Sequence, residues 1–118
     1  MAFIDFEQAL SRTEQVELRT TGRVSQRESS RPVWFVLDGK TLYLLPVSGS
    51  DSQWYKNVLA TPAIRLAAGG AEYGARATPV TDPAEVGEVI DRFRAKYGAP
   101  AVKGYYSKLD VAVEVPPS

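Results

Sequence analysis

Two apolar segments joined by a turn signal decide the fold: Pro32-Val-Trp-Phe-Val-Leu37 and Thr41-Leu-Tyr-Leu-Leu-Pro-Val47, separated by Asp38-Gly39-Lys40. An Asp-Gly pair between runs rich in β-branched and aromatic residues is typical of a tight β-hairpin. Both runs are apolar on both faces, so both faces of the hairpin must be covered. We expect the sheet to close into a barrel whose outer wall meets a second copy of the chain, with cover by the chain's own helices as the alternative.

Strand signals lie on both sides of this hairpin. The segments Gln15–Thr21 and Leu109–Val115 alternate apolar and polar side chains, which is the pattern of a strand with one buried face. Ile64–Ala68 and Ala71–Val80 flank Gly69-Gly70 and predict a second hairpin. Most of the six predicted strands are therefore joined by hairpins, which favours an antiparallel sheet.

Helix signals fall in three places. Asp5–Arg12 has a capping residue at its start, and a short helix carrying Trp54 follows the Ser/Gly/Asp-rich loop after Val47. Asp82-Pro83-Ala84-Glu85 begins a longer helix that Gly98 ends. We therefore predict a mainly β (α+β) domain over residues 1–118: a small six-stranded antiparallel β-barrel with about three short helices.

Composition limits the chemistry. The chain has 118 residues, 44% of them hydrophobic, which is enough for one domain with one core. It contains no His and no Cys, so a Ser-His-Asp triad, an imidazole base, a thiolate nucleophile and the common metal sites are excluded. Redox or proton chemistry near neutral pH would then rest on a cofactor. No apolar run reaches membrane-spanning length, and we expect a cytoplasmic protein.

Two polar segments are candidate binding sites. The balance of 14 basic and 14 acidic residues argues against a broad nucleic-acid-binding face, but Arg19–Arg31 holds four arginines against one acid. Pro46–Pro62 leads from a strand through a Ser/Gly/Asp loop into a helix, where free backbone N–H groups and Lys56 suit an anion. The alternatives are a solvated surface loop for the first segment and an ordinary helix cap by Asp51 or Ser52 for the second.

These two segments, in this order, resemble the split β-barrel flavin-binding proteins, which include the pyridoxamine phosphate oxidase-like and deazaflavin-dependent nitroreductase-like enzymes. The resemblance rests on Thr20-Thr-Gly-Arg-Val-Ser-Gln-Arg27 with Arg31-Pro32, and on Ser48-Gly-Ser-Asp-Ser-Gln-Trp-Tyr-Lys-Asn57 with Ala60-Thr-Pro62. It implies a split barrel that holds FMN or a deazaflavin coenzyme at a homodimer interface. Gln26 stands where the nitroreductase-like enzymes usually have Gly.

The resemblance also assigns roles to residues. It implies a flavin- or deazaflavin-dependent oxidoreductase that transfers hydride to or from a small organic substrate. The balanced charge, the lack of His and Cys and the short apolar runs predict no nucleic acid, metal or membrane as a partner, with a small nucleic-acid-binding barrel as a further alternative. Tyrosine is a credible proton donor, and the candidates are Tyr55, Tyr105 and Tyr106. The alternative is a barrel that binds a small ligand or coenzyme without catalysis. The expected coenzyme-binding residues are Arg23, Ser25, Arg27, Arg31, Val47, Ser48, Gly49, Ser50, Trp54, Lys56 and Asn57.

Overall fold

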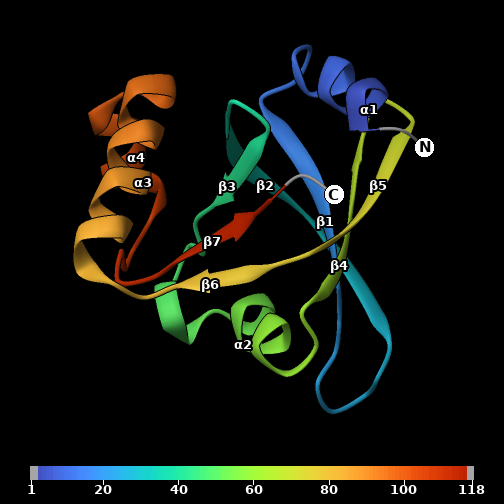
Figure 1. Ribbon diagram of the computed structural model, residues 1–118. Coiled ribbons are helices and arrows are strands. Elements are labelled where there is room, and N and C mark those ends of the chain that lie inside the picture. Colours follow the sequence, from blue (N-terminus) through green and yellow to red (C-terminus); the bar gives the residue numbers. More distant parts are fainter. Residues whose placement is uncertain (1–2, 117–118) are drawn as a thin grey trace.

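A curled antiparallel sheet forms the centre of the protein (Figure 1). The computed structural model describes residues 3–116, in which seven strands lie in the order β5-β4-β1-β2-β3-β7-β6. The strands are β1 (Gln15–Thr21), β2 (Glu28–Asp38), β3 (Thr41–Leu44), β4 (Ala63–Ala68), β5 (Ala71–Arg76), β6 (Thr78–Val80) and β7 (Ala112–Val115). The helices are α1 (Phe3–Leu10), α2 (Gln53–Ala60), α3 (Pro83–Tyr97) and α4 (Ala99–Tyr105), with the 3₁₀ helix η1 (Gly49–Asp51) before α2.

The long strand β2 joins the two halves of the sheet. Its first part pairs with β1, from Thr21 opposite Glu28 to Gln15 opposite Trp34, and its last part pairs with β3, beginning with Phe35 opposite Leu44. The two edge strands, β5 and β6, are consecutive in the chain. A single residue, Ala77, links them, so the sheet must curl to bring its two edges towards each other, which gives an antiparallel half-barrel.

The prediction of one strand over Ala71–Val80 was wrong, because the strand breaks at Ala77. The buried Ala77 N–H still donates to the Pro62 carbonyl at 2.9 Å, in register with the β4–β5 ladder, but Pro62 has no N–H to donate in return, so the pairing with β4 ends there. Beyond this break β6 changes partner and pairs with β7, with Thr78 opposite Glu114. The break raises the number of strands from the predicted six to seven.

Local signals predicted most of the other elements. The bounds of β1 are as predicted, and Gly39 closes the β2–β3 hairpin with a φ of +64°. The Asp82 carboxylate accepts a hydrogen bond from the Glu85 N–H at 3.1 Å and caps α3, which ends before Gly98. Several bounds differ from the predicted ones. Helix α1 begins at Phe3, so that Asp5 lies inside it, and it ends at Leu10. Strand β2 begins at Glu28, within the segment predicted as a basic loop, while β3 ends at Leu44 and β7 begins at Ala112. Helix α4 was not predicted.

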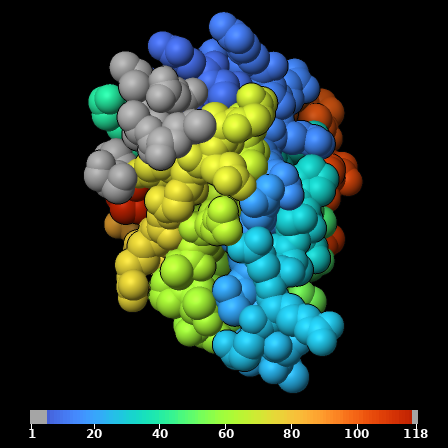
Figure 2. Space-filling view, turned by 90° about the vertical axis from the view of Figure 1, so that its right-hand side faces the viewer, coloured from blue at the N-terminus to red at the C-terminus, as the bar shows by residue number. Residues whose placement is uncertain are grey.

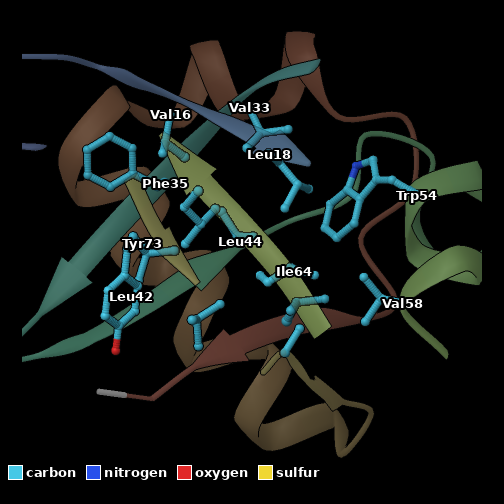
Figure 3. Close-up of a cluster of buried hydrophobic side chains, with 14 of the residues drawn as sticks. Val16, Leu18, Val33, Phe35, Leu42, Leu44, Trp54, Val58, Ile64 and Tyr73 are labelled. Carbon is cyan, nitrogen blue, oxygen red and sulfur yellow. The ribbon is translucent and has the colours of Figure 1, made fainter. Parts of the chain in front are cut away.

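The main core fills the concave side of the sheet (Figure 3). Leu18, Leu44 and Ile64 lie at its centre, and each is at most 3% exposed. Helix α2 contributes Trp54 and Val58 at one end, where Figure 3 shows the indole directed towards the strand side chains. Helix α1 closes the other end, where Phe6 stacks on Tyr73 with ring centroids 5.5 Å apart. Burial of these apolar side chains is the main driving force for the fold.

A second core lies on the outer side of β2, β3 and β7, where α3 and α4 pack (Figure 1). Val36 and Leu45 from the sheet contact the cluster of Phe93 and Val102 from the two helices, and all four side chains are at most 8% exposed. This packing corrects the expectation that a second copy of the chain covers the hairpin's outer face. The chain's own helices supply that cover.

The other half of the sheet, whose face Figure 2 shows, carries charged side chains on its outer side. Arg19 contacts Glu17 at 3.3 Å and also pairs with Glu72, and Arg65 reaches Glu72 at 3.4 Å. These ion pairs lie across β1, β4 and β5, which explains why β1 alternates while β2 and β3 are apolar on both faces.

Candidate functional site

The candidate site is a pocket of about 510 Å³, which we call the aromatic pocket. Strand β2 supplies Arg31 and Trp34, the segment from β3 to η1 supplies Val47 and Ser48, and the start of α2 supplies Gln53 and Trp54. Tyr105 and Tyr106 complete it from the end of α4. Cavities of this size, with apolar walls and a few polar groups, are typical of small-molecule sites.

A three-ring stack forms one wall of the aromatic pocket. The Trp34 indole lies between Tyr97 and Tyr105, with ring centroids 4.3 Å away on each side and interplanar angles of 12° and 11°. Both faces of Trp34 are therefore occupied by the chain itself. Tyr105 is 38% exposed and lines the pocket, so it is the ring that remains available to a ligand.

The three candidate proton donors lie in different environments. Tyr55 is 3% exposed inside the main core, where burial and the nearby Asp110 raise its pKa. Tyr106 lines the pocket with its ring, but its hydroxyl is buried and has no hydrogen-bond partner in the described residues, and burial raises its pKa strongly. Only Tyr105 combines exposure with a place in the pocket. The geometry thus favours Tyr105 over the other two.

Replacing Tyr106 by phenylalanine should stabilise the protein by about 1 kcal/mol, because it removes a buried hydroxyl that forms no hydrogen bond. Tyr97→Phe is the matched control. Its hydroxyl accepts from the Phe35 N–H at 3.2 Å and donates to the Glu14 carbonyl at 2.7 Å, so that variant should lose about 1 kcal/mol. Chemical denaturation of both variants measures the two changes. A destabilised Tyr106→Phe variant would show that the hydroxyl has a partner.

Alkaline pH should also destabilise the fold through Tyr97. Burial raises the pKa of Tyr97 from 10.0 to about 12. Between these values the folded protein holds a proton that the unfolded chain has released, so stability falls as pH rises through this range. Denaturation midpoints from pH 9 to pH 12 test this, and the slope should be smaller in Tyr97→Phe. An equal slope in both proteins would assign the alkaline loss to other groups.

The loop between β1 and β2 is bonded to the start of α2. The Asn57 amide oxygen accepts hydrogen bonds from the Arg23 backbone N–H at 3.2 Å and from the Arg23 guanidinium at 2.8 Å. The Gln53 amide oxygen accepts a further bond from the same guanidinium at 2.7 Å. Within the loop, Ser25 Oγ accepts from the Arg27 N–H at 3.2 Å. Gln26 has a φ of +61°, a conformation that glycine adopts more readily. Arg23, Ser25 and Asn57 therefore hold this loop on α2.

The turn predicted to grip a phosphate already holds a carboxylate. The Ser50 N–H and Oγ donate to the two Asp110 oxygens at 2.9 and 2.5 Å. The Ser48 N–H donates to Ser52 Oγ at 2.9 Å, and the Gly49 N–H donates to the Pro46 carbonyl at 3.1 Å. The hydrogen bonds from Ser50 lower the pKa of Asp110. The Asp110 carboxylate thus accepts the Ser50 hydrogen bonds that the sequence analysis assigned to a ligand phosphate.

Arg31 is the cation that the aromatic pocket offers to an anionic group. It is exposed and forms no salt bridge in the described residues, whereas Asp51, the acid in the pocket wall, contacts Lys108 Nζ at 3.1 Å. The pocket therefore fits a flat ring beside Tyr105 with an anionic tail on Arg31. At the Ser48–Ser50 turn the three backbone N–H groups and the Ser50 hydroxyl are already bonded within the chain.

The structure brings only part of the predicted set together. Arg31, Val47, Ser48 and Trp54 line the aromatic pocket, whereas the exposed Arg27 and the half-buried Lys56 lie outside its wall. Sequence reasoning missed Gln53, which lines the pocket, and Asp110, which occupies the turn. The position of Gln53 at the start of a predicted helix beside a polar loop was the available signal, while no local signal identified Asp110.

A metal-binding cluster and a membrane-spanning helix are both absent from the described residues. In residues 3–116, no group of three or more acidic side chains is arranged to hold a metal ion. No helix in the same part of the chain combines the length and apolar character needed to cross a membrane.

Comparison with solved structures identifies the class of fold. An F420-H2-dependent reductase (FDR-A) superposes with a TM-score of 0.68 and 20% identity, over 86% of this chain and 93% of that one. A candidate pyridoxamine 5′-phosphate oxidase from Listeria innocua gives a TM-score of 0.71 and 15% identity, over 98% and 93%. HutZ, the heme storage protein from Vibrio cholerae, superposes with a TM-score of 0.72 and 15% identity, over 100% of this chain and 92% of that one. The fold is the split β-barrel that these proteins share.

The sequence itself places the chain in a family. Residues 8–112 match the DUF2255 model, described as an uncharacterized protein conserved in bacteria, and the chain belongs to this family. No curated protein sequence matches it significantly. The fold comparison alone does not define an activity, because one fold carries many functions.

Proposed function

We propose that this protein binds a flavin-type coenzyme, FMN or a deazaflavin, in the aromatic pocket and uses it to transfer hydride to or from a small organic substrate. The observation that carries the proposal is the pocket of about 510 Å³, whose wall holds both Tyr105 and Arg31, and Arg31 forms no salt bridge within the described part of the chain. Both features match the two ends of such a coenzyme, a flat ring and an anionic tail.

The residues of the chain bind and orient. Tyr105, held by its stack on Trp34, offers a ring with restricted movement, and a flat ligand beside it loses contact with water. Arg31 holds the anionic tail by charge-assisted hydrogen bonds. The Tyr105 hydroxyl is placed to give a proton to the substrate. The coenzyme, when bound, supplies the hydride chemistry.

A non-catalytic coenzyme or ligand carrier is the second candidate function. The burial of Tyr55 and of the Tyr106 hydroxyl favours it, because a buried hydroxyl cannot give a proton to a substrate in the pocket. The chain also has no His and no Cys to replace them. Binding without turnover is the property that distinguishes this candidate from the enzyme.

A homodimer in the cytoplasm is part of the proposal. Among the described residues, the large apolar side chains with the greatest exposure are Val24, Val47, Leu59 and Tyr105. Their segments are the β1–β2 loop, the end of the β3 segment, α2 and α4, which build or adjoin the aromatic pocket. A second copy that covers this end would bury these side chains. Light scattering on the purified protein measures the mass.

Titration with FMN and with a deazaflavin coenzyme tests the function. The expected result is saturable binding of at least one coenzyme below about 100 μM, seen as a change in coenzyme absorbance and as quenching of tryptophan fluorescence. Oxidation of the reduced coenzyme by added electron acceptors then separates enzyme from carrier. Absence of binding for both coenzymes at that concentration would contradict both the enzyme and the coenzyme carrier.

A further inference from the structure

A second cavity, of about 600 Å³, lies between α1, the end of β2 and α3, and it shares no lining residue with the aromatic pocket. We call it the Lys96 cavity. Successive parts of one strand separate the two sites, because Arg31–Trp34 line the aromatic pocket and Phe35–Asp38 line this one. In Figure 1, α1 and α3 lie on either side of the β2–β3 hairpin.

The wall of the Lys96 cavity is largely apolar. Leu10 and Phe35 are each 2% exposed and form its inner surface, and Leu37 and Ala95 continue that surface towards the rim. A ligand body that contacts these groups must itself be apolar, since polar atoms would lose their hydrogen bonds with water there. The remaining question is which polar group such a ligand carries.

The ammonium group of Lys96 in the cavity wall indicates which polar group that is. Its Nζ atom lies 3.5 Å from the centroid of the Phe35 ring and donates to the Phe35 carbonyl at 2.7 Å. The ammonium has three N–H donors, and it forms no salt bridge in the described residues. Burial lowers the pKa of Lys96, while the more distant Glu14 opposes that shift. Lys96 is nevertheless an exposed residue in the cavity wall, and among the described residues no carboxylate contacts its ammonium group.

The other charged groups of the cavity leave this cation as the binding group. Arg92 Nε contacts Asp38 at 2.8 Å, and the Arg92 guanidinium lies 4.8 Å from the Tyr43 ring centroid, so this pair is internally compensated. Glu7, the second acid of the wall, is half-buried on α1. The competing interpretation is a cationic ligand bound to Glu7, which would leave the Lys96 ammonium without a new hydrogen-bond partner.

We propose that the Lys96 cavity binds a small monocarboxylic acid with an unbranched or lightly branched hydrocarbon body, its carboxylate on Lys96 and its hydrocarbon on Leu10, Leu37 and Ala95. The carboxylate completes the two unused N–H donors of the ammonium with charge-assisted hydrogen bonds. The hydrocarbon covers apolar surface that the fold leaves open. This site is independent of the coenzyme, because the cavities share no residue.

Calorimetric titration with three probes of one length tests the proposal: octanoate, octan-1-ol and octylamine. Octanoate should bind the wild-type protein at least about tenfold more tightly than either analogue, because only the carboxylate pairs with Lys96. Lys96→Met keeps an unbranched apolar stem and should lose about tenfold or more in octanoate affinity. Lys103→Met, on α4 outside the cavity, is the matched control and should bind as the wild type does.

Four results would overturn the assignment: no octanoate binding, equal binding of octan-1-ol, tighter binding of octylamine, or unchanged affinity in Lys96→Met. Arg31→Ala, which removes the cation of the aromatic pocket, should bind octanoate as the wild type does, so that the order of the three probes is assigned to the Lys96 cavity even where Lys96→Met fails to fold. Flavin binding by the same protein sample is measured separately. Whether or not flavin binds, the expected order of the three probes and its interpretation stay the same.

Discussion

Replacing Gly49 by alanine should lower the free energy of unfolding by about 3 kcal/mol or more. Gly49 has a φ of +55°, where a β-carbon is disfavoured, and an added Cβ would lie 2.0 Å from the Asp110 Oδ1 atom and 2.9 Å from the Lys108 carbonyl oxygen. The carboxylate would have to leave Ser50, which removes both hydrogen bonds of the turn at once. Urea denaturation measures the loss.

Gly39→Ala is the control for Gly49→Ala. Gly39 also has a positive φ, +64°, but no atom lies within 4 Å of an added Cβ. This variant carries only the backbone strain, about 1 kcal/mol. The difference between the two variants measures how tightly Asp110 fits the turn. Equal losses would show that the turn opens easily, and a ligand phosphate could then replace Asp110.

Replacing Arg31 by alanine should weaken FMN binding about tenfold to a hundredfold, because a charge-assisted contact with the phosphate is lost. Riboflavin has the same ring without the phosphate, so its affinity should hardly change. Titration of both compounds therefore separates the tail contact from ring binding. The prediction depends on the position of Arg31 in the wall of the aromatic pocket.

Arg27→Ala is the matched control for Arg31→Ala, since Arg27 is an exposed arginine outside the pocket wall. It should leave the FMN affinity within about twofold of the wild-type value. A larger loss in Arg27→Ala than in Arg31→Ala would place the phosphate at the β1–β2 loop, as the sequence alone suggested. It would contradict the assignment of the anionic tail to Arg31.

The sequence predicted elements whose signals are local. The alternation in Gln15–Thr21, the cap at Asp82 and the Asp38-Gly39 turn each fix backbone geometry within a few residues, and the structure confirms all three. Helix α4 has no comparable signal. It contains Pro100 and Gly104 and is stabilised by packing of Val102 against the second core.

The errors about the site come from contacts between distant segments. Asp110 follows Ser50 by 60 residues, and no pattern near Ser50 indicates that a carboxylate takes its donors. Tyr105 and Tyr106 are adjacent, but one lies against Trp34 with its ring exposed and the other has its hydroxyl buried. The difference depends on how α4 packs on the sheet. The limits that composition sets need no tertiary contact, because a side chain that the sequence lacks cannot act.

The central claim is that the aromatic pocket binds a flat coenzyme, and the two tryptophans of the chain test it most directly. Trp34 and Trp54 both line that pocket, so both indole N–H signals in a ¹H–¹⁵N NMR spectrum report on it. The account predicts that FMN or a deazaflavin coenzyme shifts both signals in a saturable way, and that octanoate shifts neither by a comparable amount. Indole signals that stay in place while a coenzyme binds would contradict the claim.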